Sequence, residues 1–142
     1  MEDFVYRKEL ANPRRVITPV RLMNPNAGRE VLTDAYWDTG AETSSILKMT
    51  ADYLRLPVLT DRCSMSGLGG KVSGRSLLTV ALPGDVRRGI IVEAFEVGEL
   101  PGDFDFIIGM DIISKGDFSI RREGEHNVLE FAFSDDFFHI KV

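Results

Sequence analysis

Glycine and proline occur at short intervals along the whole chain, and this spacing constrains the fold more than any other feature. The 142 residues include 13 glycines and 6 prolines, which separate short segments rich in valine, isoleucine, leucine and phenylalanine. Short apolar segments between turn residues are typical of β-strands, whereas a long helix needs an unbroken period of 3.6. We therefore expect an all-β domain with one or two short helices.

The first hairpin is the clearest prediction. Residues 15–23 alternate in polarity, residues 24–28 read Asn-Pro-Asn-Ala-Gly, and residues 30–37 form a second apolar segment. Asparagine, proline and glycine between two such segments favour a turn. The second strand of this hairpin then runs directly into Asp38.

Further strands and two short helices follow. We expect a glycine-rich hairpin over 62–75, a second hairpin from 77–82 and 89–97, and an apolar strand that enters Gly109. Thr50 is a plausible N-cap for a short helix that ends before Pro57, and Asp111 is expected to cap another over 112–115.

The C-terminal residues alternate between phenylalanine or another apolar residue and a polar one. Leu129, Phe131 and Phe133 share one face of a first segment, and Phe138 lies in a second. We expect a single domain over 1–142 with its core at about 16–128. The C-terminal hairpin 128–142 is then a candidate for the interface with a second subunit.

Composition excludes several classes of protein. The net charge of −5 argues against nucleic acid as a partner, and the single cysteine, Cys63, excludes a disulfide framework. No apolar run reaches the roughly 18 residues of a membrane span. We expect a cytoplasmic protein with no membrane partner.

The most informative motif is Asp38-Thr39-Gly40-Ala41. An apolar strand delivers one carboxylate to a tight turn, where Gly40 allows the backbone to approach that carboxylate closely. A surface turn with no chemical role also explains Asp-Thr-Gly, since aspartate and glycine are common in turns.

The order of three motifs resembles that of the retropepsin-like aspartic proteases, over about residues 20–128. Asp38 to Ala41 is similar to the catalytic loop of this family, Met65-Ser66-Gly67-Leu68-Gly69-Gly70 to its flap tip, and Ile107 to Asp111 to the strand and helix that support the site. The resemblance implies a closed, barrel-like acid protease fold with a flap hairpin, and an aspartic endopeptidase that needs no cofactor or metal.

The chain carries one Asp-Thr-Gly, whereas hydrolysis by this route uses two carboxylates. We therefore expect a homodimer in which Asp38 of each copy contributes to one dyad. One member takes a proton from water and the other protonates the scissile carbonyl. The resemblance implies that Thr39 cross-bonds beneath the dyad.

The same resemblance assigns an extended peptide or protein as substrate. Ala41, Glu42 and Thr43 would lie along the peptide backbone, and Ile107 would line a specificity pocket. The flap residues Ser66, Gly67, Leu68, Gly69 and Gly70 would close over it.

Three residues depart from the family pattern. Trp37 stands where a smaller aliphatic residue or phenylalanine is more common, which alters the packing beneath the loop. Met110 replaces the arginine with which retroviral members brace the loop. Ala41 supplies no hydroxyl to the ionised dyad, so we expect an optimum at mildly acidic pH.

Other chemistries are less well supported. Cys63 would need a positioned histidine, and His126 and His139 are the only two in the chain. A metal bound by Asp135, Asp136 and His139 is disfavoured, since adjacent aspartates are common in turns. The competing function is a non-catalytic dimeric module that binds a peptide or protein and retains the protease fold.

Overall fold

The computed structural model describes residues 3–67, 70–83, 88–134 and 139–141. Eleven strands and two short helices are seen in these ranges, so the expectation of a mostly β domain with two short helices is confirmed. The strands are β1 (Asp3–Glu9), β2 (Ile17–Met23), β3 (Glu30–Trp37), β4 (Ser45–Leu47), β5 (Val58–Gly67), β6 (Gly70–Pro83), β7 (Arg88–Val97), β8 (Phe106–Ile108), β9 (Gly116–Glu123), β10 (His126–Ser134) and β11 (His139–Lys141). The helices are α1 (Lys48–Leu54) and α2 (Met110–Ile113).

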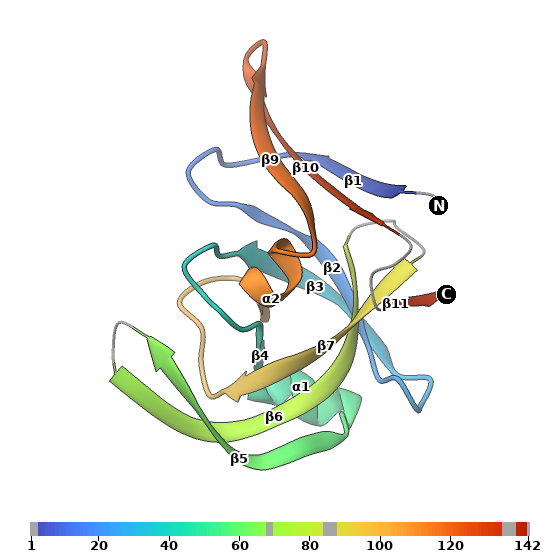
Figure 1. Ribbon diagram of the computed structural model, residues 1–142, viewed down its shortest axis with the longest axis vertical. Helices are drawn as coiled ribbons and strands as arrows, with labels where there is room; N and C mark the ends of the chain where they lie inside the picture. Colours follow the sequence, from blue (N-terminus) through green and yellow to red (C-terminus); the bar gives the residue numbers. More distant parts are fainter. Residues whose placement is uncertain (1–2, 68–69, 84–87, 135–138, 142) are drawn as a thin grey trace.

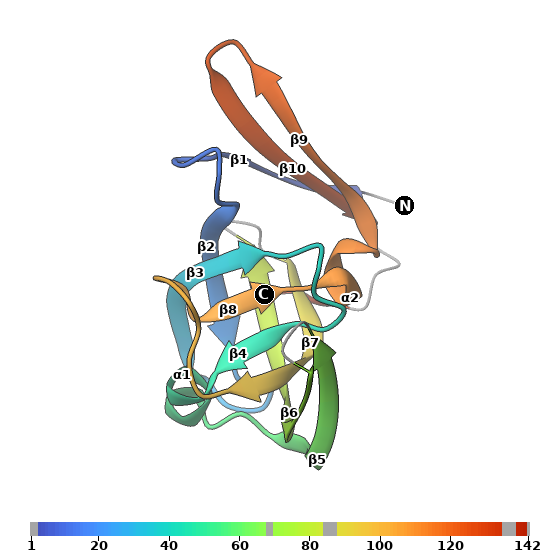
Figure 2. The same cartoon turned by 90° about the vertical axis from the view of Figure 1, so that its left-hand side faces the viewer.

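Eight strands form one sheet that closes on itself. Their order is β11-β7-β4-β8-β3-β2-β6-β5, and an additional pairing joins β7 to β6. The six strands from β7 to β6, counting both, therefore form a closed hydrogen-bonded ring, which leaves β5 and β11 outside it. Figures 1 and 2 show this barrel below a second, separate sheet.

The first hairpin forms as expected. β2 pairs antiparallel with β3, and alternate residues of β2, Thr18, Val20 and Leu22, are buried in the barrel. Alternation places every second side chain on the same face of a strand, and burial of that face fixes the register. The hairpin β6–β7 is also confirmed, with Ser76 to Ala81 opposite Phe95 to Ile90.

The second sheet has three antiparallel strands in the order β1-β10-β9. The indole of Trp37, which is 3% exposed, joins it to the barrel. Its ring centroid lies 5.3 Å from that of Phe131, 5.4 Å from Phe118 and 6.5 Å from Tyr6. Aromatic rings at these distances attract one another and bury a large apolar area. The last residue before Asp38 therefore rests on the second sheet.

Two expectations about the ends of the chain are wrong. In the expected hairpin 128–142, the two described strands do not pair with each other, because β10 lies between β1 and β9 while β11 pairs with β7 in the other sheet. Both edges of β10 are occupied within the chain, so β10 cannot supply an intersubunit edge. The core also extends beyond 16–128, because Tyr6, Phe131 and Phe133 are buried in it.

Both helix caps also differ from expectation. Thr50 lies inside α1, whose N-cap is Leu47, and its hydroxyl donates to the Asp105 carboxylate at 2.8 Å. Helix α2 starts at Met110 with Gly109 as N-cap, so Asp111 lies inside the helix. Thr50 therefore bonds another segment, and Asp111 bonds both Ser44 and the Ile112 N–H of its own helix, the latter at 3.0 Å.

Candidate active site

Asp38 directly follows β3, which pairs with β2 on one side and with β8 on the other. β3 runs parallel to β8 with Trp37 opposite Ile108, and the Asp38 N–H donates to the Ile108 carbonyl at 2.9 Å. Trp37 and Ile108 are buried, while Asp38 is half-buried. Flanking buried residues hold the backbone of Asp38 at the barrel surface, as a site on a rigid element requires.

The turn after Asp38 encloses its carboxylate. The Gly40 N–H donates to Asp38 Oδ1 at 2.8 Å, and the Ala41 N–H donates to the Asp38 carbonyl at 3.2 Å. A β-carbon on Gly40 would lie 3.2 Å from Oδ1, so the glycine permits this close approach. The side chain is therefore oriented by its own turn and still reaches solvent.

The rest of the loop is bound to the N-terminal end of α2. The Met110 N–H donates to the Ala41 carbonyl at 2.7 Å, and the Asp111 N–H donates to the Glu42 carbonyl at 3.1 Å. A β-carbon on Gly109 would lie 2.7 Å from the carbonyl carbon of Thr43. The segments 41–43 and 109–111 therefore pack backbone against backbone.

One side-chain pair completes this junction. Asp111 Oδ2 accepts from the Ser44 N–H at 2.9 Å, and Oδ1 accepts from the Ser44 hydroxyl at 2.8 Å. Ser44 Oγ also accepts from the Gly109 N–H at 3.1 Å, and Ser44 is fully buried. Hydrogen bonds to a carboxylate are stronger than those between neutral groups, so this pair fixes the loop firmly.

Sequence reasoning did not identify Ser44 and Asp111 as partners. Asp111 was expected to be a helix cap, and Met110 was noted only for the arginine that it replaces. The pair stands 67 residues apart, and a spacing of this size carries no local periodicity. Asp111, the residue after Met110, holds the loop through its two hydrogen bonds with Ser44.

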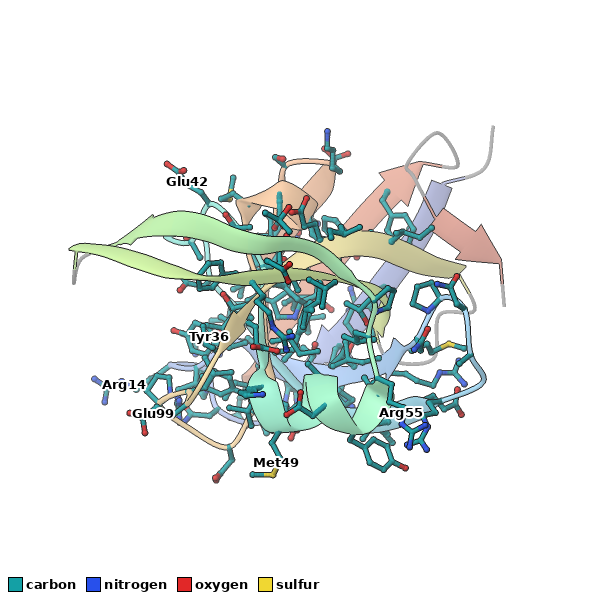
Figure 3. All side chains as sticks on the ribbon, turned by 90° about the horizontal axis from the view of Figure 1, so that it is seen from below. Arg14, Tyr36, Glu42, Met49, Arg55 and Glu99 are labelled. Carbon is teal, nitrogen blue, oxygen red and sulfur yellow. The ribbon has the colours of Figure 1, made fainter. Side chains whose placement is uncertain are left out.

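The other predicted loop residues are at the surface. Thr39, Gly40 and Glu42 are exposed, while Ala41 and Thr43 are half-buried. Figure 3 shows Glu42 at the periphery of the molecule. Ile107 is half-buried in β8, where its backbone lies opposite Ser45 of β4 and Tyr36 of β3. It directly precedes Ile108, whose carbonyl accepts from the Asp38 N–H.

The predicted flap residues are described only in part. Ser66 pairs with Lys71 and Gly67 with Gly70 in the antiparallel ribbon of β5 and β6, whereas Leu68 and Gly69 lie outside the described residues. Figure 1 shows this ribbon projecting beyond the barrel. The structure therefore joins Asp38 to β8 through Ile108, and Ala41 and Glu42 to the start of α2. Among the described residues it gives no contact between this loop and the ribbon end.

The base of the ribbon is tied to β7. Arg75 donates two hydrogen bonds to the Glu96 carboxylate, the shorter at 2.8 Å. A β-carbon on Gly74 would lie 2.9 Å from the ring of Phe95. The hydrogen bonds that Arg75 donates to Glu96, followed by the negative charge of Glu96, raise the pKa of the Arg75 guanidinium. The ribbon therefore leaves the barrel from an anchored point.

The described ranges of the chain form neither a metal-binding cluster nor a membrane-spanning helix. These ranges hold no group of three or more histidine, cysteine, aspartate or glutamate side chains arranged to bind a metal ion. Asp135 and Asp136 lie outside them, as does the side chain of His139. No described helix is long and apolar enough to span a membrane.

Comparison with known proteins gave one kind of match. No protein-family model matches the sequence, and no curated protein matches it. Among solved structures, the chain is similar to a retropepsin-like aspartic protease from Rickettsia conorii. The match covers 93% of this chain and 96% of that chain, with 15% sequence identity and a TM-score of 0.49.

Proposed function

We propose that the chain is an aspartic endopeptidase whose two catalytic carboxylates are Asp38 and Asp38 of a second copy. The observation that carries the proposal is the fixed loop 38–44. Its backbone is hydrogen-bonded to Ile108, Met110 and Asp111, and its carboxylate remains half-exposed. Catalysis by positioned groups requires this combination of rigid support and access.

The chemistry follows from two carboxylates that share one proton. The ionised carboxylate removes a proton from water, and the resulting hydroxide attacks the scissile carbonyl carbon. The protonated carboxylate donates its proton to the carbonyl oxygen. The carboxylate that took a proton from water then passes it to the amide nitrogen, and the tetrahedral intermediate releases the amine while one of its hydroxyl protons returns to the other carboxylate. Two carboxylates about 3 Å apart cannot both remain ionised, which keeps the shared proton available.

A single Asp38 cannot fill both roles, so the proposal requires a homodimer with Asp38 near its two-fold axis. Thr39 belongs to the same exposed turn and would meet its copy there. An extended peptide would lie between the loop and the β5–β6 ribbon, with Glu42, Thr43 and Ile107 along it. Extended peptides gain main-chain hydrogen bonds from such walls.

The test compares wild type, Asp38→Asn and Asp34→Asn on a mixed peptide library, with cleavage products read by mass spectrometry. Asp34 is an exposed aspartate on the same strand, so it is a matched control. We expect Asp38→Asn to lower the cleavage rate by more than about a thousandfold and Asp34→Asn to leave it unchanged. Equal cleavage by wild type and Asp38→Asn would remove Asp38 from the mechanism. Peptide binding without cleavage by wild type would favour the binding module instead.

A further inference from the structure

Strand β9 has one edge without a partner strand among the described residues. β10 pairs with it on one side from Gly116 to Glu123, and the three-stranded sheet ends at β9. An unpaired edge of this length exposes a row of N–H and C=O groups, and edge strands are normally protected by charged side chains, proline, bulges or a covering segment. The charged side chains of β9 carry both signs, so a second copy of the strand can match them instead of being repelled. β9 contains no proline, and its register with β10 is continuous.

The free edge lies on the side of the molecule that carries Asp38. β9 begins three residues after the last residue of α2, and α2 is bound to the Asp38 loop through Asp111. Figure 2 shows β9, α2 and the loop between β3 and β4 along the same side, with β1 at the opposite edge of the sheet. A second copy that docks on β9 is thus directed toward the Asp38 loop.

We propose that β9 pairs antiparallel with β9 of a second copy, with Ser119 on the two-fold axis. This inference rests on the proposed function, because that function requires a second copy. In this register Asp117 lies opposite the partner's Arg121, and by symmetry Arg121 lies opposite the partner's Asp117. Phe118 lies opposite the partner's Ile120 in the same way, so the strand is complementary to itself.

The side chains involved are available for such contacts. Asp117 and Arg121 are exposed on one face of the strand, and Ile120 is 43% exposed on the other. An exposed isoleucine at a sheet edge would be covered by the partner's Phe118, which is half-buried. Opposite charges and apolar pairs directly across two strands both stabilise the pairing.

Neighbouring registers are less favourable. Residues directly opposite each other in two antiparallel strands point to the same face of the sheet. A two-fold axis perpendicular to a continuous sheet must therefore pass between one residue and its own copy, so each possible register is centred on a residue. Centring on Phe118 places Lys115 opposite the partner's Arg121. Centring on Ile120 places Asp117 opposite the partner's Glu123. Both of these registers place like charges opposite each other across the interface, which is destabilising. Of the three registers, only the one centred on Ser119 avoids this repulsion.

Charge exchange tests the register. Asp117→Arg and Arg121→Asp each place like charges at both symmetric positions, and the double variant restores attraction with the signs reversed. We expect each single variant to raise the dimer dissociation constant about tenfold or more, and the double variant to return it to within about threefold of wild type. Sedimentation velocity at low salt measures the constant, and Asp103→Arg, an exposed aspartate in a distant turn, is the control.

Cysteine crosslinking provides a second measurement. Ser119→Cys, made in a Cys63→Ser background, brings two thiols together on the axis, within the Cα separation of about 4.4–6.8 Å that a disulfide spans. We expect oxidation to give a covalent dimer. Arg122→Cys is the matched control, because its two copies stand about 20 Å apart in this register and should not crosslink.

These readouts are independent of hydrolysis. The β9 interface would be overturned if the wild type is monomeric or if the single variants dimerise as the wild type does. It would also be overturned if the double variant does not recover dimerisation, or if Ser119→Cys gives no crosslink. Variants that fail to fold are recognised by circular dichroism. If the dimer behaves as proposed while Asp38→Asn still cleaves peptides, the interface stands and the catalytic proposal fails.

Discussion

Asp111 accepts two hydrogen bonds from Ser44, one from its N–H at 2.9 Å and one from its hydroxyl at 2.8 Å. These bonds join the loop that carries Asp38 to the helix that follows β8. Ser44 is fully buried, so its polar groups have no access to water when the carboxylate is removed. This pair therefore holds the loop in place, although neither residue belongs to the Asp-Thr-Gly motif.

The first prediction concerns Asp111→Ala. Loss of the carboxylate leaves the Ser44 N–H and hydroxyl without an acceptor, and we expect the free energy of unfolding to fall by about 2–4 kcal/mol. Urea denaturation measures this change. Asp103→Ala removes an exposed aspartate and should change stability by less than about 0.5 kcal/mol. A similar small change for Asp111→Ala would show that the pair does not brace the loop.

Gly109→Ala tests the close contact between the two loop segments. A β-carbon there would lie 2.7 Å from the Thr43 carbonyl carbon and 2.8 Å from its oxygen, and both are backbone atoms that cannot rotate away. We expect a loss of about 3 kcal/mol in thermal or urea unfolding, together with lower peptidase activity. Gly28→Ala is the matched control, since no atom lies within 4 Å of its added β-carbon. Equal stability of the two variants would contradict the packing described above.

A pH-dependent contribution to stability is expected from Arg7 and Glu123 of the second sheet. The hydrogen bond from Arg7, followed by its positive charge, lowers the pKa of the Glu123 carboxyl below 4.5. Because the pKa is lower in the folded state, the stabilisation is present above the unfolded pKa and is lost as pH falls through the folded value. The melting temperature of Glu123→Gln should therefore lie below that of wild type at pH 7, and the two should converge at acidic pH.

The control for this pH dependence is Glu125→Gln, in the exposed turn of the same hairpin. Its melting temperature should follow that of wild type across the whole pH range. A gap between wild type and Glu123→Gln that persists unchanged at pH 3 would show that the effect is not due to ionisation of Glu123.

The local patterns of the sequence predicted the parts of the fold that depend on alternation and turns. The β2–β3 hairpin formed as expected, because one face of each strand must be buried and residues 24–28 favour a turn. The position of Asp38 at a strand end followed from the same pattern. These features depend on neighbours within a few residues.

Long-range partners could not be predicted in this way. Thr50 and Asp111 both carry side chains suited to helix caps, yet each bonds a segment more than 50 residues away in sequence. The pairing of β1 with β10 joins the two ends of the chain, and it occupies one edge of a strand within the segment 128–142 that is a candidate for the subunit interface. Composition and periodicity give no information about which distant strand will occupy an edge.

Trp37 shows how a local sequence feature and long-range contacts combine. From the sequence, it was a large residue in the position before the aspartate. In the fold, its ring contacts Phe118 and Phe131 of the second sheet, and its Nε1–H donates to the buried Thr18 hydroxyl at 2.9 Å. The second sheet supplies the space and the contacts for this large side chain, so packing explains a tryptophan at this position.

Subunit mixing tests the shared dyad most directly. A fixed amount of wild type is combined with increasing Asp38→Asn protein, at concentrations where dimers predominate and after time for exchange, and total peptidase activity is measured. If each site needs Asp38 from both copies, an equal amount of Asp38→Asn lowers the activity to about half, because mixed dimers are inactive. Activity that stays constant as Asp38→Asn is added would show that each chain acts alone, and would contradict a dyad built from two copies of Asp38.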